Sequence, residues 1–561
     1  MIPRLPLAVV LPAMGAGTMA ATGAISLRAP LWSAIALGIA IAALGATRIH
    51  QTNIWRILHM RIELWLRNRR GALPAPPTEP FDIAIPDSPG AQCGMRWDGT
   101  HLITMLALDR TTVTPTLLAT NGPSNGVTLS LADAADCLAQ FDIRLAAIDV
   151  VTLGMRTKGP DDVVRLYERL LGPLPAAATQ TVWLVLRFDP LDNVEAIDIR
   201  GSGQEGTVRT ALVATRRVAA RLASQRVRVT ALTAAELTAA ESAMFHDIAP
   251  QEWTEGWRTL RTNGFELAGF GLAPDHLDAT DLGAVWRLPA KSVLTRVRLT
   301  PTAATAPGSR ASSVAVSALI RRDLAGTGHH DDDGTPRELG LRALRGCQRQ
   351  VLLDGGQLEA ADLLRTTPQQ LAEFTVAAAG SGQVIGATRE GLGVAVPLFG
   401  PGIRRVEIVG GRRLAMLMVL RAVAVGAQVI VHSSRPADWA CLVDAVGTPT
   451  ALAVSSPGSA QYTAAATMIV YDGVASTGQV SDATAVHVRA AIEAPSALLG
   501  ADVVLLEDPT DPTTVRVRTQ GEELTVAVVS IAAEAAYLTP AETRAEAESA
   551  PAESEPVLAA V

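Results

Sequence analysis

Glycine-rich segments offer the first residues in this chain that could do chemistry. Gly201, Gly203 and Gly206 form a G-x-G-x-x-G run directly before a predicted helix at 207–224, a pattern that can hold the pyrophosphate of a dinucleotide. Such a site also needs a preceding strand, and an acid about twenty residues later that binds the ribose. The following strand carries arginines where that acid belongs, and its nearest acid is Glu236. We weigh a cofactor site against a glycine-rich helix start, and favour the helix start.

A second glycine turn, Gly410–Gly411, lies between a predicted strand at 405–409 and a predicted helix at 412–425. Free backbone N–H groups at the start of a helix can bind phosphate. However, the sequence contains no G-x-x-x-x-G-K-[ST] segment, and neither of its two lysines, Lys158 and Lys291, lies near this turn. The lysine and the magnesium-binding hydroxyl of a phosphate site are therefore missing. We predict a nucleotide-binding type of fold without nucleotide chemistry.

One polar run contains residue types that bind metal ions: His329, His330, Asp331, Asp332 and Asp333. Adjacent side chains rarely converge on one ion without partners from elsewhere, and Asp-Gly runs are common in solvated turns, so we favour a solvated turn. The sequence contains no H-E-x-x-H segment. We predict no catalytic residues, no cofactor-binding residues, no metal-binding residues, no cofactor and no enzymatic activity.

The distribution of charge divides the 561 residues into a basic head and an acidic body. Residues 1–70 contain eight arginines and one acid, Glu63, so this head carries +7 although the whole chain has a net charge of −7. An acidic body gives no reason to expect nucleic-acid binding. The four cysteines lack the spacing of a zinc site or a disulfide framework, which predicts reduced, mostly buried thiols in the cytosol. They are Cys93, Cys137, Cys347 and Cys441.

The head begins with two uncharged stretches, at about 5–27 and 29–47. A helix over the 23 residues of the first stretch would extend about 34 Å, enough for a hydrocarbon core of about 30 Å. We therefore expect a transmembrane hairpin over residues 1–47, anchored in the lipid bilayer. Arginines follow the second stretch, which by the positive-inside rule makes the chain a multi-pass protein of the inner membrane with both termini and the large soluble domains in the cytoplasm. A cleaved signal peptide is the alternative that the second stretch disfavours.

Residues 48–70 place apolar side chains at helical spacing opposite basic ones. This pattern predicts a basic amphipathic juxtamembrane helix. Its tryptophans, Trp55 and Trp65, would lie at the level of the lipid headgroups, with its arginines near the lipid phosphates. A helix packed on partner subunits has the same pattern, and the sequence leaves both readings open.

Strands and helices alternate along the rest of the chain, which is typical of α/β domains. A proline-rich linker at 71–80 precedes a first cytosolic domain at 81–320, and a linker at 321–338 precedes a second cytosolic domain at 339–535. We expect both domains to be doubly wound and Rossmann-like. Residues 536–561, rich in Ala, Glu and Pro, predict a disordered acidic tail. The expected fold class is a membrane-anchored α/β protein.

Several segments, taken in their order, resemble the EccE family of the mycobacterial type VII (ESX) secretion system. The hairpin and the Trp- and Arg-rich helix come first, followed by MRWDGTHLITML, FDIRLAAIDVVTLGMRT, VRLYERLLGPLPA, TVWLVLRFDPLDNVEAI, TVRTALVATRRVAARLAS and ALTAAEL. The resemblance extends to about residue 320, and the later domain looks like a longer C-terminal part that some members carry. None of these segments is a catalytic motif, so no catalytic residues carry over from the family.

The resemblance implies a structural role in a secretion complex of the inner membrane. It implies assembly with EccB, EccD and the ATPase EccC, as a hetero-oligomer repeated in a larger assembly. Our leading hypothesis is a noncatalytic assembly subunit that stabilises this complex. The alternative is a membrane-anchored enzyme that uses a nucleotide or a sugar nucleotide at a degenerate glycine-rich site, 201–206 or 410–411. A membrane protein that acts alone is a third possibility.

Overall fold

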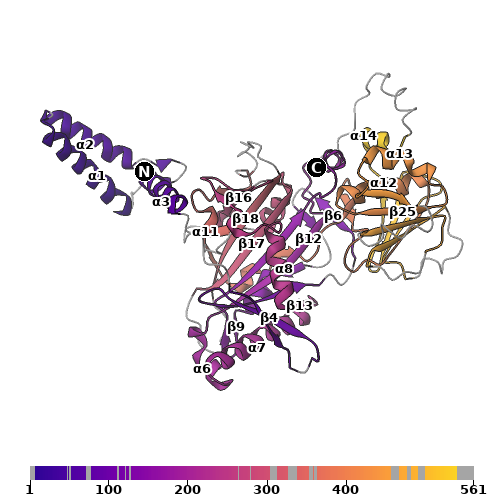
Figure 1. Ribbon diagram of the computed structural model, residues 1–561, viewed down its shortest axis with the longest axis horizontal. Coiled ribbons are helices and arrows are strands. Elements are labelled where there is room, and N and C mark those ends of the chain that lie inside the picture. Colours follow the sequence, from indigo (N-terminus) through magenta and orange to yellow (C-terminus); the bar gives the residue numbers. More distant parts are fainter. Residues whose placement is uncertain are drawn as a thin grey trace. The chain divides into compact units, whose positions relative to one another are not determined.

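The architecture is described from a computed structural model of the chain (Figure 1). Two compact units are present: unit 1 contains residues 1–76, 249–269 and 343–357, and unit 2 contains residues 77–248, 270–342 and 358–561. The structure describes residues 7–28, 30–46, 48–49, 52–70, 78–86, 88–109, 113–119, 122–124, 128–262, 264–277, 279–302, 313–325, 336, 338–352, 358, 363–455, 466–476, 482–490 and 500–539. The run of His329 to Asp333 and nearly all of the predicted acidic tail lie outside these residues.

Unit 1 begins with a hairpin of two helices, α1 (Leu7–Ser26) and α2 (Leu31–Ala46). A Cβ atom on Gly38 would lie 2.8 Å from the backbone oxygen of Gly17 and 3.0 Å from the Cβ of Ala21. No side chain fits in that space, so small residues are what allow the two helices to approach each other closely.

The predicted transmembrane hairpin is wrong. Within the described residues, no helix combines the length and the apolar character that crossing a membrane requires. The 16 residues of α2 extend about 24 Å, less than a hydrocarbon core of about 30 Å. The prediction rested on missing charges, yet residues 14–26 of α1 are mostly Gly, Ala and Thr, and an uncharged stretch need not be strongly hydrophobic. The predicted multi-pass topology has no pair of spanning helices in this part of the chain.

The rest of unit 1 consists of a third helix and short segments from the middle of the chain. Two short strands join α2 to α3, and the antiparallel strands β14 and β15 precede β16, whose first part belongs to this unit. The elements are β1 (Arg48–Ile49), β2 (Thr52–Asn53), α3 (Ile54–Arg70), β14 (Thr254–Glu255), β15 (Leu260–Arg261), β16 (Phe265–Leu272) and α11 (Gln348–Leu352).

One sheet of unit 2 is antiparallel throughout the order β18-β17-β11-β12-β5-β4-β3. The doubly wound, Rossmann-like fold predicted for residues 81–320 is therefore wrong, because that fold is built on parallel strands. The strands are β3 (Phe81–Ala84), β4 (Gln92–Trp97), β5 (Leu102–Leu108), β11 (Ala147–Met155), β12 (Thr179–Phe188), β17 (Ser292–Pro301) and β18 (Val314–Ala325), with β13 (Val229–Ala231) also paired to β5. The helices are α4 (Leu131–Asp136), α6 (Val194–Ile199), α7 (Gly203–Ser224) and α8 (Ala234–Met244).

Helix α5 (Asp161–Leu171) is the reason why strand–helix alternation does not lead to parallel strands here. The chain leaves β11, forms α5 and returns antiparallel to β11 as β12. The buried side chains Val163, Leu166 and Leu170 of α5 belong to the hydrophobic core of the second sheet. Because α5 packs there, it does not make the crossover over the first sheet that a parallel pair requires.

The second sheet of unit 2 is mixed, in the order β26-β25-β27-β28-β24-β29-β30-β31-β22-β23-β6-β7. Its strands from β26 to β29 are parallel, and the others pair antiparallel. The doubly wound, Rossmann-like fold predicted for residues 339–535 is therefore also wrong, because half of this sheet is antiparallel. The parallel half contains the strands and helices that the sequence places between 405 and 446. The parallel strands are β24 (Arg405–Val409), β25 (Val429–Ser433), β26 (Leu452–Ser455), β27 (Met468–Asp472), β28 (Thr484–Arg489) and β29 (Val503–Glu507).

The antiparallel half of this sheet includes a strand from much earlier in the chain. β6 pairs with β23, so residues 116–119 lie beside residues 393–396. The strands are β6 (Thr116–Ala119), β7 (Gly122–Ser124), β22 (Gln383–Ala387), β23 (Gly393–Val396), β30 (Thr514–Thr519) and β31 (Glu523–Ala527). The helices of the second sheet are α12 (Arg412–Ala424), α13 (Ala437–Val446) and α14 (Ala532–Tyr537).

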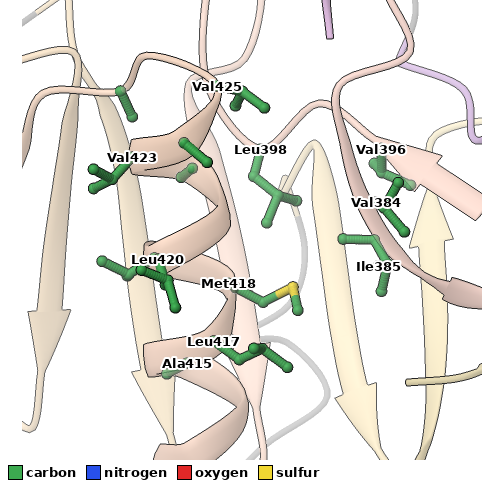
Figure 2. Packing of buried hydrophobic residues seen from close by; sticks show 14 of the residues in the cluster. Val384, Ile385, Val396, Leu398, Ala415, Leu417, Met418, Leu420, Val423 and Val425 are labelled. Atoms are coloured by element: carbon green, nitrogen blue, oxygen red, sulfur yellow. The ribbon is translucent and has the colours of Figure 1, made fainter. Parts of the chain in front are cut away.

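Helix α12 lies in the centre of the core of the second sheet. Every residue from Leu414 to Ala424 is buried, as expected of a helix that is enclosed on all sides. Leu417 and Met418 extend from α12 toward the side of Ile385 and Leu398 (Figure 2). The helix is therefore a packing element for strands on both sides.

The buried guanidinium group of Arg421 connects α12 to its neighbours by hydrogen bonds. Arg421 makes two hydrogen bonds of 2.8 Å to the carboxylate of Glu534 on α14, and both side chains are about 1% exposed. The same guanidinium donates to the carbonyl oxygens of Val384, Ile385 and Val529. One side chain thus joins α12, β22 and the segment that leads into α14.

We predict that Glu534→Gln destabilises unit 2 strongly. The substitution removes the charge that balances the buried Arg421, and breaking a buried pair from one side costs about 3–5 kcal/mol. Urea unfolding followed by circular dichroism measures the change. The control is Glu205→Gln, which breaks an exposed pair with Arg209 (side chains 68% and 59% exposed) and should cost less than about 0.5 kcal/mol. Equal effects of the two substitutions would contradict the role given to Arg421.

Candidate functional site

The predicted glycine turn, Gly410–Gly411, lies where the sequence places it, between β24 and α12. Glu507, at the end of the neighbouring strand β29, turns its side chain into this turn, and the N–H of Gly411 donates to its carboxylate. A Cβ atom on Gly410 would lie 2.5 Å from the Cβ of Glu507. The position where a bound phosphate would lie at the start of α12 is therefore occupied by a carboxylate of the chain itself.

The occupation of this turn has an electrostatic consequence. The partial positive charge at the start of a helix attracts one negative group, and Glu507 already supplies it. The nearest basic side chain of the helix, Arg412, pairs with Asp438 on α13. A phosphate group at this place would have to displace one carboxylate and separate an ion pair, which makes the turn a poor nucleotide site.

A second carboxylate, Asp472, lies at the end of β27 on the same edge of the parallel strands. Its side chain accepts hydrogen bonds from Ser433 (2.7 Å), Arg435 (2.8 Å) and the indole of Trp439 (3.0 Å). Burial alone would raise the pKa of Asp472, but these three hydrogen bonds and the charge of Arg435 lower it. Ligands of α/β sheets bind at this kind of edge, and here the polar groups are directed at one another.

The run Gly201, Gly203 and Gly206 joins two helices. Gly201 lies between α6 and α7, whereas Gly203 and Gly206 lie in the first turn of α7, so no strand immediately precedes the run. A Cβ atom on Gly206 would lie 2.6 Å from the backbone oxygen of Ile197, and this glycine therefore lets α7 pack closely on α6. The geometry is that of a helix–helix turn and not that of a dinucleotide-binding strand–turn–helix unit.

The candidate metal run, His329 to Asp333, lies outside the described residues. Within the described residues, no group of three or more His, Cys, Asp or Glu residues has the arrangement of a metal site. Cys93 and Cys137 are buried. Burial raises the pKa of each of these two thiols to about 12, so both stay protonated and unreactive at neutral pH.

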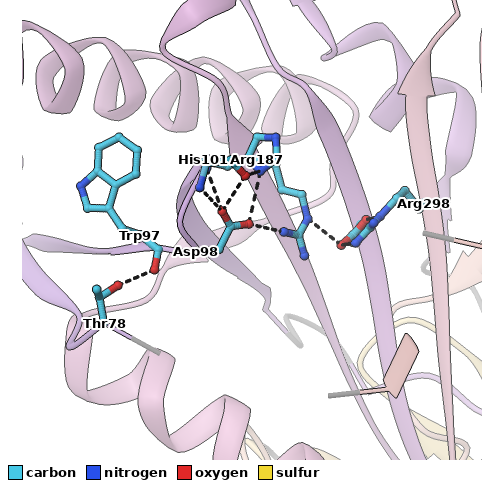
Figure 3. Close-up of polar contacts among 8 residues, drawn as sticks. Thr78, Trp97, Asp98, His101, Arg187 and Arg298 are labelled. Carbon is cyan, nitrogen blue, oxygen red and sulfur yellow. Dashed lines mark hydrogen bonds and ion pairs between the residues drawn. The ribbon is translucent and has the colours of Figure 1, made fainter. Parts of the chain in front are cut away.

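A charged network crosses one face of the antiparallel sheet (Figure 3). Asp149 on β11 accepts hydrogen bonds from Arg298 on β17, at 2.5 and 2.8 Å, and from Arg187 on β12, at 3.2 Å. Arg187 also donates to Asp98, 2.8 Å away, which in turn accepts from the backbone N–H of His101 at 2.7 Å. These contacts bind neighbouring strands to one another, and Asp149 is only 1% exposed.

Helix α3 turns part of its basic face toward its own unit. The guanidinium of Arg61 lies 4.7 Å from the ring centroid of Trp257, a cation–π contact. Arg67 lies 3.5 Å from the buried carboxylate of Glu255 and donates to the carbonyl of Gly346 at 2.6 Å. At least two arginines of the predicted amphipathic helix thus contact protein of the same chain.

The apolar side of α3 is left open. Leu58, Ile62 and Trp65 recur at helical spacing and are 46%, 48% and 56% exposed. The guanidinium of Arg69 covers the ring of Trp65 at 5.0 Å. The helix predicted over residues 48–70 begins only at Ile54, because residues 48–49 and 52–53 form short strands, and it carries an apolar stripe beside basic side chains.

Sequence reasoning missed the acids that fill the candidate sites, namely Glu507, Asp472 and Asp149. Each lies in or at the end of a strand, which the sequence pattern places correctly in outline. Their roles depend on which strands are neighbours, and a local pattern does not contain that information. An acid directly after a predicted parallel strand was the available signal for Glu507, since the ends of such strands meet at one edge.

Comparison with known proteins relates the chain to the components of a bacterial secretion system. Residues 176–272 match the sequence model of a family described as "Putative type VII ESX secretion system translocon, EccE". These residues include β12, α6 and α7. The resemblance to EccE predicted from the sequence is therefore confirmed.

Individual relatives carry the same family name. The chain is 29% identical over 187 residues to the ESX-1 secretion system protein EccE1 of Mycolicibacterium smegmatis. The aligned region covers 32% of this chain and 38% of that protein. The chain is 28% identical over 259 residues to the ESX-5 secretion system protein EccE5 of Mycobacterium marinum, covering 44% and 57%. It is 23% identical over 404 residues to the ESX-2 secretion system protein EccE2 of Mycobacterium tuberculosis, covering 70% of each. The first two matches span about half the length of those relatives or less.

We predict that Gly410→Ala is more harmful than Gly400→Ala. Both glycines have a positive φ, +154° and +114°, so both substitutions strain the backbone. Only at Gly410 would the new Cβ atom collide with Glu507, whereas nothing lies within 4 Å of the corresponding atom at Gly400. The difference in the free energy of unfolding should be about 1–3 kcal/mol.

A double substitution separates this collision from backbone strain. With Glu507→Gly in the background, Gly410→Ala should cost no more than Gly400→Ala, because both the Cβ and the carboxylate of Glu507 that would clash are gone. Chemical unfolding of the four variants measures the cycle. If Gly410→Ala costs the same with and without Glu507, the carboxylate does not occupy the turn.

We predict a pH dependence of stability that comes from Asp149. Burial raises its pKa, but hydrogen bonds and charge from Arg298, with the charge of Arg187, outweigh burial and lower the pKa to about 2. Because the pKa in the unfolded chain is about 3.9, the stabilisation is complete above about pH 4 and is lost as the pH falls toward 2.

The measurement compares wild type with Asp149→Asn in urea between pH 2 and pH 7. The difference in unfolding midpoint should be constant at neutral pH and shrink below about pH 4. Asp162→Asn, at a side chain that is 74% exposed, serves as the control and should change little at any pH. A wild-type advantage over Asp149→Asn that persists unchanged to pH 2 would refute this assignment.

Proposed function

We propose that this protein is a noncatalytic structural subunit of a type VII (ESX) secretion complex. The observation that carries the proposal is the match of residues 176–272 to the EccE family model, together with relatives that are named as ESX secretion system proteins. The matched residues form buried strand and helix packing and contain no catalytic motif. A structural subunit needs stable surfaces and no catalytic residues, which agrees with the packing and the sequence of these matched residues.

The closed state of the glycine turn supports a noncatalytic role. Glu507 lies in the turn at the start of α12, and Asp472 is held by three side chains at the same edge of the sheet. An enzyme that uses a nucleotide or a sugar nucleotide would leave donors at this edge free for phosphate. The alternative function as such an enzyme is therefore the less favoured one.

The proposed partners are EccB, EccD and the ATPase EccC, in a hetero-oligomer that is repeated in a larger assembly at the inner membrane. We propose no nucleic-acid partner, because the net charge of the chain is −7. The apolar stripe of α3, formed by Leu58, Ile62 and Trp65, supports contact with a neighbouring subunit or with the membrane surface, since exposed apolar stripes on helices are typical of both.

The test is co-purification of the tagged full-length chain after mild detergent extraction of host membranes. We expect EccB, EccC and EccD to be recovered together with it. Glu507→Gln and Asp472→Asn should change secretion only in proportion to the amount of assembled complex, because neither carboxylate takes part in a reaction. Glu522→Gln, at an exposed residue, is the matched control. Normal assembly with lost secretion in either variant would contradict the structural role, and so would failure of wild type to recover the three proteins.

A further inference from the structure

Unit 2 buries its large apolar side chains almost completely, with one local exception. Among the described residues of this unit, those that stay strongly exposed are Phe141 at 80%, Leu191 at 84%, Val194 at 54% and Ile199 at 77%. Scattered exposed apolar residues are ordinary on a protein surface. These four, however, all come from two neighbouring segments, the turn between β9 (Ala139–Gln140) and β10 (Ile143–Arg144) and the residues from 191 to the end of α6.

Hydrogen bonds hold these two segments side by side, as the labels β9 and α6 in Figure 1 indicate. The amide of Asn193 accepts from the N–H of Arg144 at 2.7 Å and donates to the carbonyl of Arg144 at 2.9 Å. Arg200, directly after α6, pairs with Asp142 in the turn at 2.6 Å. The four exposed side chains therefore come from two segments that are in contact. We name them together the α6 patch and define it as Phe141, Leu191, Val194 and Ile199.

The conformation of Phe141 is unusual for an aromatic residue. Its φ is +51°, a region that bulky residues rarely adopt and that costs about 1–2 kcal/mol. Arg217 supports the turn by donating to Asp142 at 2.9 Å and to the carbonyl of Gln140 at 3.2 Å, and its guanidinium lies 5.5 Å from the phenyl ring. The chain thus accepts backbone strain at a residue whose side chain gains little burial, and strain of this kind is concentrated at functional positions.

Acids outnumber basic residues in the two segments of the patch, with four acids against the two arginines Arg144 and Arg200. Asp192, Glu195 and Asp198 alternate with its apolar residues and are exposed. The fourth acid, Asp142, is shared by Arg200 and Arg217. An apolar surface with an acidic rim attracts a partner whose apolar residues are flanked by basic ones, and it repels the anionic surface of a bilayer.

We propose that the α6 patch docks a basic amphipathic helix of a neighbouring subunit. The apolar face of that helix covers Phe141, Leu191 and Ile199, and its Lys or Arg side chains pair with the three acids. Helix-in-groove contacts of this type anchor a few apolar residues and use charge for orientation. The inference rests on the proposed function for where the partner is found, since Leu191, Val194 and Ile199 lie within the residues that match the EccE family model.

The first experiment places a photo-crosslinking amino acid at Ile199 of the full-length chain in the purified membrane complex. We expect a crosslink to a Lys- or Arg-rich helix of EccB, EccC or EccD, mapped by mass spectrometry. A crosslink to a second copy of this chain, to lipid, or to an acidic or uncharged segment would overturn the proposal, and so would the absence of any protein crosslink.

Two sets of variants test the apolar and the charged parts separately. Phe141→Gly with Leu191→Gln removes apolar contact while glycine relieves the strain at position 141, so the fold should be retained. Asp192→Lys with Glu195→Lys reverses the rim. Each pair should reduce recovery of the crosslinked subunit at least about tenfold, equivalent to about 1.4 kcal/mol of binding free energy.

The matched control is Glu522→Lys with Glu523→Lys, which makes the same change of charge at two exposed residues where β31 begins. It should leave recovery unchanged, and thermal unfolding should confirm that all variants are folded. If the patch variants recover the subunit as well as wild type does, the docking proposal fails while the proposed function stands. If wild type itself recovers none of the three proteins, the proposed function fails.

Discussion

The second sheet of unit 2 depends on the burial of one positive charge. A guanidinium group removed from water is costly unless each of its donors has an acceptor and its charge has a partner. Arg421 meets both conditions through Glu534 and three carbonyl oxygens. Those acceptors come from β22, from the residues after β31 and from α14, so satisfying the guanidinium requires that segments far apart in the sequence assemble together. A hydrophobic side chain would fill the same volume without specifying these neighbours.

The opposite end of α12 is held by the same kind of contact. Glu507 accepts from the N–H of Gly411, so carboxylates act at both ends of a helix that is otherwise enclosed by aliphatic side chains. A strand, a glycine turn and a helix are thereby used to fix packing, although the same three elements bind phosphate in other proteins. The loop before α5 reinforces the arrangement, because the N–H groups of Lys158 and Gly159 donate to the carbonyl of Ala424 at 3.1 Å. The strand, turn and helix resemble those of a nucleotide site, but the carboxylate of Glu507 fills the place where phosphate would bind.

Local pattern predicted the elements well and their assembly poorly. The strand at 405–409, the helix at 412–425 and the glycine turn between them are found as expected, because short-range periodicity and glycine geometry determine them. The doubly wound fold predicted for residues 81–320 was wrong, since the place where α5 packs depends on a core formed more than 200 residues later. The transmembrane hairpin was wrong because missing charge was taken as hydrophobicity. The acids of the candidate sites were not predicted either, because the contacts of Glu507 and Asp149 depend on which strands are neighbours, and a local pattern does not contain that order.

Part of the charge that divides the basic head from the acidic body is neutralised by contacts within the chain. Arg61 and Arg67 of α3 are used within unit 1, by Trp257 and Glu255, so part of the +7 of residues 1–70 is internal. In unit 2, Asp149 is matched by Arg298 and Arg187 in the same way. Acids that remain at the surface beside exposed apolar groups, as around the α6 patch, are then the ones whose field reaches another molecule, because the fields of opposite charges held in contact largely cancel at a distance. The net charge of a surface is therefore best taken over the side chains that are not in ion pairs. Taken in this way, the charge around the α6 patch is negative.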